Sequence, residues 1–226
     1  MALPLIRGIL FDAEGIVIDT EAAWDAAQEQ FLARRGIAYE RSKLKPLLSG
    51  RTLAEGAVVM QDMYKYPGDV ASHVEERRAL MRDLIANRTG FIPGFELFFA
   101  SIKDRYLVAL ATAMDVELFD LVDQRLNLTA LFNRQVITLR DVHFKSKPNP
   151  DLFLCAAKSL NLSPALFAVI EDAPLGVKAA INAGMFAIAL TTTYRRSLLA
   201  EAHLICSSFE EILAALQPLH KGKPDF

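Results

Sequence analysis

The stretch Leu5–Glu21, with the sequence LIRGILFDAEGIVIDTE, decides the fold and points to the chemistry. A short apolar strand ends in Asp12, a second carboxylate follows at Glu14, and Gly15 comes next. Two carboxylates at this spacing contribute little to a hydrophobic core, because buried charges are costly. The same arrangement is well suited to placing a carboxylate nucleophile beside a bound metal ion. We therefore place the candidate active site at the end of this strand.

Composition excludes several classes of function. The chain has 226 residues, of which 52% are hydrophobic and 23% charged, so it can bury a large core. A formal net charge of -2 gives no indication of a nucleic-acid or anionic-membrane partner. No apolar run approaches the ~18 residues of a membrane span, and the apolar N-terminus is expected to form a strand and not a signal peptide. The length suits one core domain that carries a smaller inserted unit.

The two cysteines, Cys155 and Cys206, lie in no CxxC motif and no Cys/His cluster. Buried free thiols are therefore favoured over a disulfide or a metal pair. This favours a reducing, cytoplasmic location.

Strand-like and helix-like patterns alternate over most of the chain, which predicts an α/β fold with a Rossmann-like, doubly wound parallel sheet. The expected strands are Leu5–Phe11, Tyr106–Leu110, Gln135–Ile137, Phe167–Ile170, Phe186–Leu190 and His203–Cys206. The expected helices between them are Val116–Leu126, Pro150–Leu160, Leu175–Ala183 and Phe209–Leu216.

The stretch from about residue 21 to about residue 88 breaks this alternation. It holds helical patterns at Ala22–Arg35, Leu53–Tyr64 and Val70–Asn87 but no convincing strand. We interpret it as an all-helical domain inserted after the first strand. The predicted boundaries are 1–18 and 90–226 for the core domain and 19–89 for the helical cap domain.

Chemistry-bearing residues follow four expected strands, at Asp12 with Glu14, at Thr112, at Lys147, and at Glu171–Asp172. Ligands of open α/β sheets bind outside the carboxyl ends of the strands, so these residues are expected to converge. Clustered carboxylates repel one another unless a cation compensates them, and Mg²⁺ prefers such oxygen ligands. Lys147 adds a positive charge for a phosphate oxygen, and Thr112 can donate its hydroxyl beside free backbone N–H groups. The sequence therefore predicts a phosphoryl-binding pocket with a carboxylate nucleophile.

This ordered set closely resembles the haloacid dehalogenase-like (HAD) superfamily of phosphotransferases, over nearly the whole chain. The family carries DxD after its first strand, Ser or Thr after the second, a Lys near KPxP, and an acidic doublet. The insertion resembles the C1-type cap of the β-phosphoglucomutase-like and sugar-phosphate phosphatase group. That second resemblance lies in IDTEAAW at Ile18–Trp24, LSGRT at Leu48–Thr52 and IPGFELF at Ile92–Phe98.

The resemblance implies roles for the four acidic residues. Asp12 would attack phosphorus and form an aspartyl-phosphate, and Glu14 would protonate the leaving group and then activate water. Mg²⁺ would bind the Asp12 carboxylate, the backbone carbonyl of Glu14, Asp172 and Glu171.

The resemblance also implies contacts to the substrate. Thr112, the Ala113 N–H and Lys147 would hold the phosphate oxygens. Substrate-binding residues of the insertion would be Glu21, Gly50 and Arg51, although a solvent-facing position suits Arg51 equally well.

One position departs from the family, whose second acid is usually Asp. Glu14 adds a methylene, which displaces the carboxyl group by about an ångström, and such misplacement can cost about 100-fold in rate. Three readings follow: a pocket adjusted to the longer acid, a slow phosphatase whose aspartyl-phosphate persists, or a catalytically weak protein that binds a phosphorylated ligand.

The favoured function is Mg²⁺-dependent hydrolysis of a small phosphate monoester, such as a sugar phosphate or similar metabolite. The alternative enzyme is a β-phosphoglucomutase-like phosphosugar mutase. Haloacid dehalogenation is less favoured, because that chemistry requires neither Mg²⁺ nor the acidic doublet. We expect a monomer.

Overall fold

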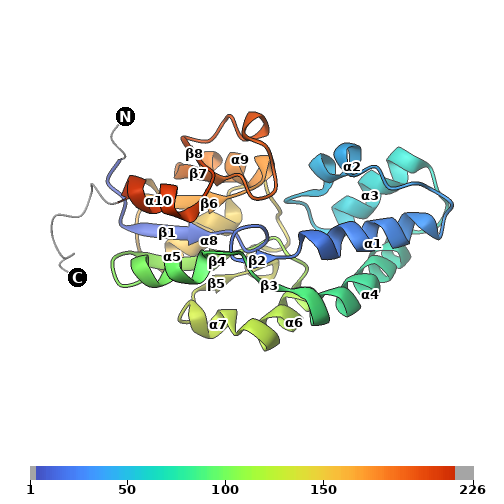
Figure 1. Cartoon of the computed structure of the whole chain (residues 1–226), viewed down its shortest axis with the longest axis horizontal. Coiled ribbons are helices and arrows are strands. Elements are labelled where there is room, and N and C mark those ends of the chain that lie inside the picture. Colours follow the sequence, from blue (N-terminus) through green and yellow to red (C-terminus); the bar gives the residue numbers. More distant parts are fainter. Residues whose placement is uncertain (1–3, 217–226) are drawn as a thin grey trace.

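The computed structural model describes residues 4–216, apart from the side chains of residues 86–88. Six parallel strands form one sheet in the order β5-β4-β1-β6-β7-β8 (Figure 1). The predicted doubly wound parallel sheet is therefore confirmed. Its strands are β1 (Gly8–Phe11), β4 (Leu107–Ala111), β5 (Val136–Ile137), β6 (Phe167–Glu171), β7 (Phe186–Leu190) and β8 (Leu204–Cys206).

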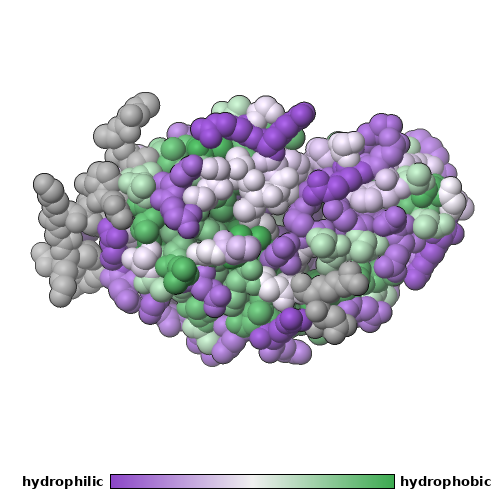
Figure 2. Space-filling view, viewed as in Figure 1, coloured by the Kyte–Doolittle hydropathy of each residue, from purple (hydrophilic) through white to green (hydrophobic). Residues whose placement is uncertain are grey.

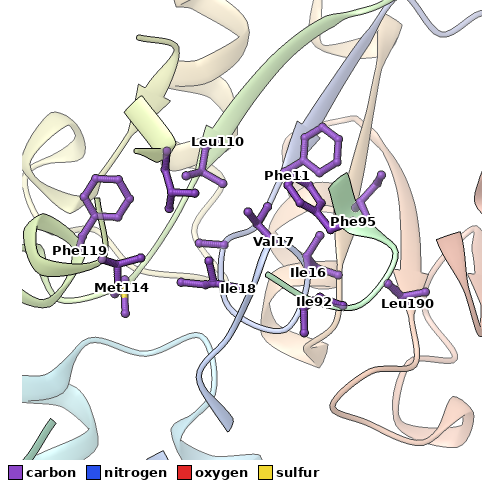
Figure 3. Packing of buried hydrophobic residues seen from close by; sticks show 14 of the residues in the cluster. Phe11, Ile16, Val17, Ile18, Ile92, Phe95, Leu110, Met114, Phe119 and Leu190 are labelled. Carbon is purple, nitrogen blue, oxygen red and sulfur yellow. The ribbon is translucent and has the colours of Figure 1, made fainter. Parts of the chain in front are cut away.

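Both faces of the sheet are covered, and this explains why its strands are almost continuously apolar. Ile9 and Phe11 of β1 belong to one hydrophobic cluster, and Leu10 between them belongs to the other. Phe11 meets the ring of Phe95 at a centroid distance of 5.9 Å (Figure 3). The helical elements outside the segment between β2 (Ile18–Asp19) and β3 (Gly90–Phe91) are α5 (Phe95–Ile102), α6 (Val116–Leu126), α7 (Leu128–Leu131), η1 (Leu139–Val142), α8 (Asp151–Ser159), η2 (Pro164–Leu166), α9 (Pro174–Asn182), η3 (Arg196–Leu198) and α10 (Phe209–Leu216).

Four helices lie between two short antiparallel strands, β2 (Ile18–Asp19) and β3 (Gly90–Phe91). They are α1 (Glu21–Ala33), α2 (Arg41–Leu48), α3 (Leu53–Tyr64) and α4 (Val70–Arg88), and Figure 1 shows them gathered on one side of the sheet. We call them the insertion helices. Hydrophilic side chains predominate over them on the face shown in Figure 2.

The structure corrects some predicted elements. The first strand begins at Gly8 and not at Leu5, whose side chain is 53% exposed. Helices α2 and α7 were not predicted, because α2 contains Pro46 and α7 has only four residues. Proline inside a helix removes a backbone hydrogen bond, which makes such a segment read as a loop.

Candidate active site

The carboxyl ends of β1 and β6 bring three carboxylates together. Phe11 pairs with Ile170 in the register of these two strands, and the Asp12 N–H donates to the Ile170 carbonyl at 3.0 Å. Asp12 thus lies beside Glu171, the last residue of β6, and Asp172, which follows it. All three side chains are buried, and each offers a carboxylate oxygen within 4.8 Å of the others. This confirms the expected convergence of these three residues.

The loop after Asp12 is fixed by its own backbone and by the core. The Gly15 N–H donates to the Ile18 carbonyl, and the Val17 N–H donates to the Ala13 carbonyl, at 2.8 Å each. The apolar side chains that follow Gly15 are buried in the core below the site (Figure 3). Gly15 has a φ of +76°, and a Cβ added there would lie 2.0 Å from Asp172 Oδ2. Glycine is therefore required for the loop to pass beside the cluster.

Lys147 compensates part of the charge. Its Nζ donates to Asp12 Oδ1 and to Glu171 Oε1, at 2.5 Å each, and the residue is 2% exposed. The other oxygen of Glu171, Oε2, accepts the N–H groups of Asp172 at 2.8 Å and Ala173 at 2.9 Å. Both oxygens of Glu171 are therefore engaged, and its carboxylate holds Lys147 and the following turn in place.

Burial governs the protonation of the cluster. Desolvation raises the pKa of Asp12 to about 7 against the attraction of Lys147, and nearby Glu171 raises it further. Desolvation also raises the pKa of Asp172 well above its ordinary value, and the charges of Glu171 and Asp12 add to this. For Lys147, burial favours the neutral amine, but the two carboxylates prevail and its pKa is raised. Three carboxylates against one ammonium leave an excess of negative charge, which protonation of a carboxyl group or a further cation offsets.

The donor set fits Mg²⁺. It consists of carboxylate oxygens alone, which hard divalent cations prefer. With both oxygens of Glu171 already engaged, Asp12 and Asp172 are the side chains best placed to hold the ion. The side chain of Glu14 lies outside this group of three.

Glu14 is held instead by the start of the insertion. Its Oε1 accepts hydrogen bonds from Thr20 Oγ1 at 2.7 Å and from Trp24 Nε1 at 2.5 Å. Burial raises the pKa of Glu14, and the hydrogen bonds from Trp24 and Thr20 oppose that rise. Trp24 was not predicted as a site residue, although the only tryptophan of the chain stands four residues after Thr20, at the start of an expected helix.

Two of the three predicted phosphate ligands, Thr112 and Ala113, follow β4. Thr112 is buried, and its Oγ1 accepts the Met114 N–H at 3.0 Å, so the hydroxyl closes the turn that follows the strand. Ala113 and Met114 line the pocket described next, whereas Thr112 lies behind them. The contact between Thr112 and a phosphate oxygen stays a prediction.

A pocket with an empty volume of about 890 Å³, part of it open solvent, lies above the carboxylates. It is lined by Asp12, Lys147 and Asp172 on the sheet side and by α1, α3 and α4 on the other. Hydrogen bonds tie the insertion to loops of the sheet around the pocket, among them one from Ser146 to Glu55 at 2.7 Å and one from Tyr194 to Ser49 at 2.6 Å.

The three substrate-binding residues predicted in the insertion, Glu21, Gly50 and Arg51, all line this pocket. Glu21 is already paired with Lys45 and with Arg41. Arg51 is exposed, and its Nε donates to the Leu47 carbonyl at 2.9 Å. The contacts of Glu21, Gly50 and Arg51 with a substrate stay predictions.

Comparisons with known proteins agree with this geometry. The family model for haloacid dehalogenase-like hydrolases matches residues 6–184. The putative phosphatase YhcW of Bacillus subtilis is 31% identical over 94% of this chain and 96% of its own. The mitochondrial (DL)-glycerol-3-phosphatase 1 of Arabidopsis thaliana is 29% identical over 98% of this chain and 75% of its own.

Solved structures show the same fold. A haloacid dehalogenase-like protein from Agrobacterium tumefaciens superposes with a TM-score of 0.80 at 20% identity, over 95% of this chain and 99% of the other. A β-phosphoglucomutase from Clostridium difficile superposes with a TM-score of 0.77 at 23% identity, over 93% of this chain and 97% of the other.

The chain belongs to the haloacid dehalogenase-like hydrolase family. Within that family it is a phosphoric monoester hydrolase, in line with relatives that are named as phosphatases. Across residues 4–216, no helix has the length and apolarity that crossing a membrane would require.

Proposed function

We propose that the protein is a Mg²⁺-dependent phosphatase that hydrolyses a small phosphate monoester through an aspartyl-phosphate on Asp12. The observation that carries the proposal is the buried network in which Lys147 bridges Asp12 and Glu171 beside Asp172. Relatives named as phosphatases of glycerol 3-phosphate, fructose 1-phosphate and hexitol phosphates support a sugar phosphate or similar metabolite as the substrate.

In the first step, a carboxylate oxygen of Asp12 attacks phosphorus and the bond to the ester oxygen breaks. Asp12 Oδ1 accepts from Lys147, so Oδ2 is the oxygen we assign to the attack. Glu14 gives its proton to the departing oxygen, and burial of its carboxyl group raises its pKa. In the second step, Glu14 takes a proton from water, and the water oxygen attacks the aspartyl-phosphate, which releases phosphate and regenerates Asp12.

The residues around Asp12 position the phosphoryl group. Lys147, the Thr112 hydroxyl and the Ala113 N–H would bind its oxygens, and Asp12 and Asp172 would hold Mg²⁺, with Glu171 fixing Lys147. When bound, Mg²⁺ supplies positive charge that stabilises the transferring phosphoryl group. We assign residues 19–89 as a cap domain that contributes the opposite wall of the pocket and limits water during transfer.

The test is phosphate release from a panel of phosphorylated metabolites, with Mg²⁺ or with EDTA, for the wild type and Asp12→Asn. Release that requires Mg²⁺ and is lost in Asp12→Asn supports the proposal. Conversion of a hexose 1-phosphate to the 6-phosphate without release would favour the mutase. Binding without turnover on any substrate would favour the catalytically weak ligand-binding alternative.

A cytoplasmic location and a monomeric state belong to the same proposal. Cys155 and Cys206 are both free thiols, which supports a reducing compartment. Gel filtration coupled to light scattering would test the monomer.

A further inference from the structure

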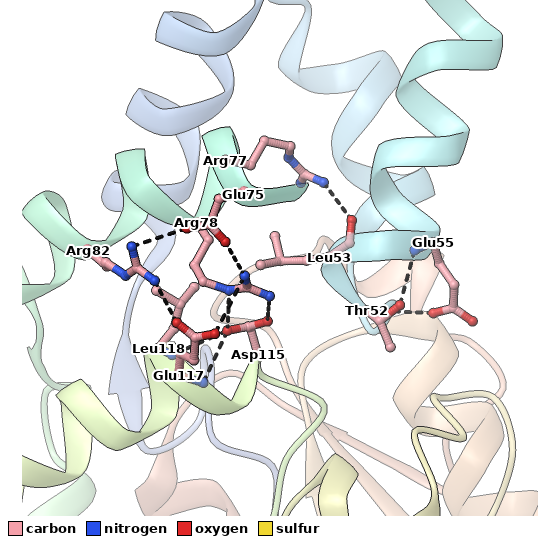
Figure 4. Close-up of polar contacts among 10 residues, drawn as sticks. All are labelled: Thr52, Leu53, Glu55, Glu75, Arg77, Arg78, Arg82, Asp115, Glu117 and Leu118. Carbon is pink, nitrogen blue, oxygen red and sulfur yellow. Dashed lines mark hydrogen bonds and ion pairs between the residues drawn. The ribbon is translucent and has the colours of Figure 1, made fainter. Parts of the chain in front are cut away.

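Helix α4 carries a buried guanidinium that the proposed mechanism does not use. Arg77 is 3% exposed and lines the pocket. Its Nη1 donates to the Leu53 carbonyl at 3.0 Å, and its Nε has no hydrogen-bond partner. Figure 4 shows Arg77 extended toward Leu53 and apart from Arg78 and Arg82, which are paired with acidic residues.

Arg77 differs in this respect from the other buried cations of the pocket. Lys147 is paired with Asp12 and Glu171, and Lys45 is paired with Glu21. Within the described part of the chain, no carboxylate lies within 4.0 Å of the Arg77 guanidinium. A buried charge without a counter-charge is unfavourable, so a site that keeps one is suited to an anion that enters with the ligand. Desolvation lowers the pKa of Arg77 only to about 10, so it stays charged at neutral pH.

The guanidinium of Arg77 is only partly hydrogen-bonded. A Cβ added to Gly56 would lie 3.1 Å from Nη1, so the glycine makes room for that nitrogen and its bond to Leu53. Nε has no hydrogen-bond partner, and together with Nη2 it forms an edge that can donate to two oxygens of one carboxylate or phosphate. Gln28, 5% exposed and also on the pocket wall, has an Oε1 without a hydrogen-bond partner. Two buried polar side chains of this wall thus have unsatisfied atoms.

We propose that Arg77 binds a second anionic group of the substrate, a carboxylate or a further phosphate, at the end remote from the phosphoryl group that Asp12 attacks. The inference rests on the proposed function, because it assigns the substrate class of the same pocket. The enzyme then selects phosphate monoesters that carry this second charge over neutral alcohol phosphates of equal size. Gln28 adds a polar contact beside that group.

Matched substrates test the inference. Glycerol 3-phosphate and 3-phosphoglycerate differ only in a CH₂OH against a carboxylate, and fructose 6-phosphate and fructose 1,6-bisphosphate differ in a second phosphate. The wild type is expected to prefer the charged member of at least one pair by about tenfold in kcat/KM, as a charge-assisted hydrogen bond provides. The pair that shows the preference tells carboxylate from phosphate.

In Arg77→Met the ratio of kcat/KM for the charged member to that for the neutral member is expected to fall to about one, because the charged member loses more than the neutral one. Arg77→Lys keeps the charge but loses the paired donors of the guanidinium, so its ratio of kcat/KM for the charged and neutral members should be intermediate. Arg82→Met, on the exposed side of the same helix, is the control and should keep the wild-type ratio. An unchanged ratio in Arg77→Met, or an equal loss on all substrates, would overturn the inference.

Calorimetry separates this inference from the proposed function. The four ligands are titrated into Asp12→Asn with Mg²⁺ present, with Arg77 intact or changed to Met, so no turnover is needed. Tighter binding of a charged member that depends on Arg77 supports the inference even if the wild type hydrolyses nothing, in which case the phosphatase proposal alone fails. Hydrolysis that depends on Asp12, with equal affinity for charged and neutral members, overturns the inference and leaves the phosphatase. Failure to bind any of the four ligands also overturns it.

Discussion

The indole Nε1–H of Trp24 donates to Glu14 Oε1 at 2.5 Å, which links an insertion helix to the proposed acid–base group of the sheet. Thr20 donates to the same oxygen at 2.7 Å. Because the two donors converge on one oxygen, they fix the carboxylate at the reach of a glutamate side chain. The extra methylene of Glu14 relative to the aspartate that is usual in the family is therefore matched by a partner in this chain.

Glu14→Asp is expected to lower phosphatase activity by about 10- to 100-fold, and not to raise it toward a family optimum. The shorter side chain draws its carboxylate away from Trp24 by about one bond length, and misplacement on that scale is costly. The measurement is kcat on the best substrate of the panel. Higher activity in Glu14→Asp would show that the glutamate restricts turnover and is not accommodated.

Trp24→Phe is expected to lower kcat by about tenfold, because Glu14 loses one of its two donors. The double variant Trp24→Phe with Glu14→Asp should lose little more than Glu14→Asp alone, since both changes break the same hydrogen bond. Fully additive losses would show that Trp24 acts on the substrate independently of Glu14. Phosphate affinity measured in Asp12→Asn should not change on addition of Trp24→Phe.

Lys147→Met is expected to abolish detectable turnover and to destabilise the fold. The change leaves Asp12 and Glu171 as buried carboxylates without their cation, and breaking a buried pair in this way costs about 3–5 kcal/mol. Lys178→Met is the matched control, because its pair with Glu201 is exposed and is expected to be worth less than about 1 kcal/mol. Urea unfolding of both variants gives the comparison, and similar losses would contradict it.

Most of the sheet could be predicted because strands buried on both faces are apolar runs between turn residues. β7 matches its predicted range, Phe186–Leu190, and α6 matches Val116–Leu126. The short strand β5 is one residue shorter than its predicted range, Gln135–Ile137, because the ends of a strand show little alternation in the sequence. α2 was missed because its polar residues and Pro46 read as a loop, whereas packing against α3 stabilises the helix.

The acidic cluster could be predicted because parallel strands place their carboxyl ends together, as with Asp12 and Glu171. On the insertion side, Glu21, Gly50 and Arg51 were predicted and line the pocket. Other residues of its wall could not be predicted, because which face of a helix meets the pocket depends on how the helices pack. For Arg51, a substrate contact and a solvent-facing position were equally favoured; its Nε donates to the Leu47 carbonyl, and its contact with the substrate stays a prediction. No sequence feature distinguished Arg77 from the other charged residues of the expected helix Val70–Asn87, yet it is buried on the pocket wall.

The metal-free protein is expected to lose stability as pH rises from 5 to 8. The pKa of Asp12 is raised from 3.8 to about 7 on folding, so the folded state binds more protons than the unfolded state in this window. The free energy of unfolding is therefore highest below the pKa that Asp12 has in the unfolded chain. It falls as the pH passes the pKa of Asp12 in the folded protein, by on the order of 2 kcal/mol between pH 5 and pH 8. Mg²⁺ should restore most of the loss at pH 8.

Thermal unfolding in EDTA and in Mg²⁺, at pH 5 and at pH 8, measures this effect. Asp172→Asn removes one carboxylate of the cluster and should reduce both the pH dependence in EDTA and the stabilisation by Mg²⁺. Equal midpoints at both pH values in EDTA would show that Lys147 compensates the cluster without a metal ion.

Arg78→Met is expected to raise KM several-fold with little change in kcat, because it loosens the insertion over the pocket. Arg78 donates from Nε and Nη2 to both oxygens of Asp115, at 3.1 and 3.0 Å, and so joins α4 to the start of α6 (Figure 4). Asp115 also caps α6 by accepting the Glu117 N–H, and this bond survives in the variant. Arg82→Met breaks only more exposed pairs, so its KM should stay close to that of the wild type. An equal rise in KM in both variants would show that general charge on α4, and not the Arg78–Asp115 pair, holds the insertion in place.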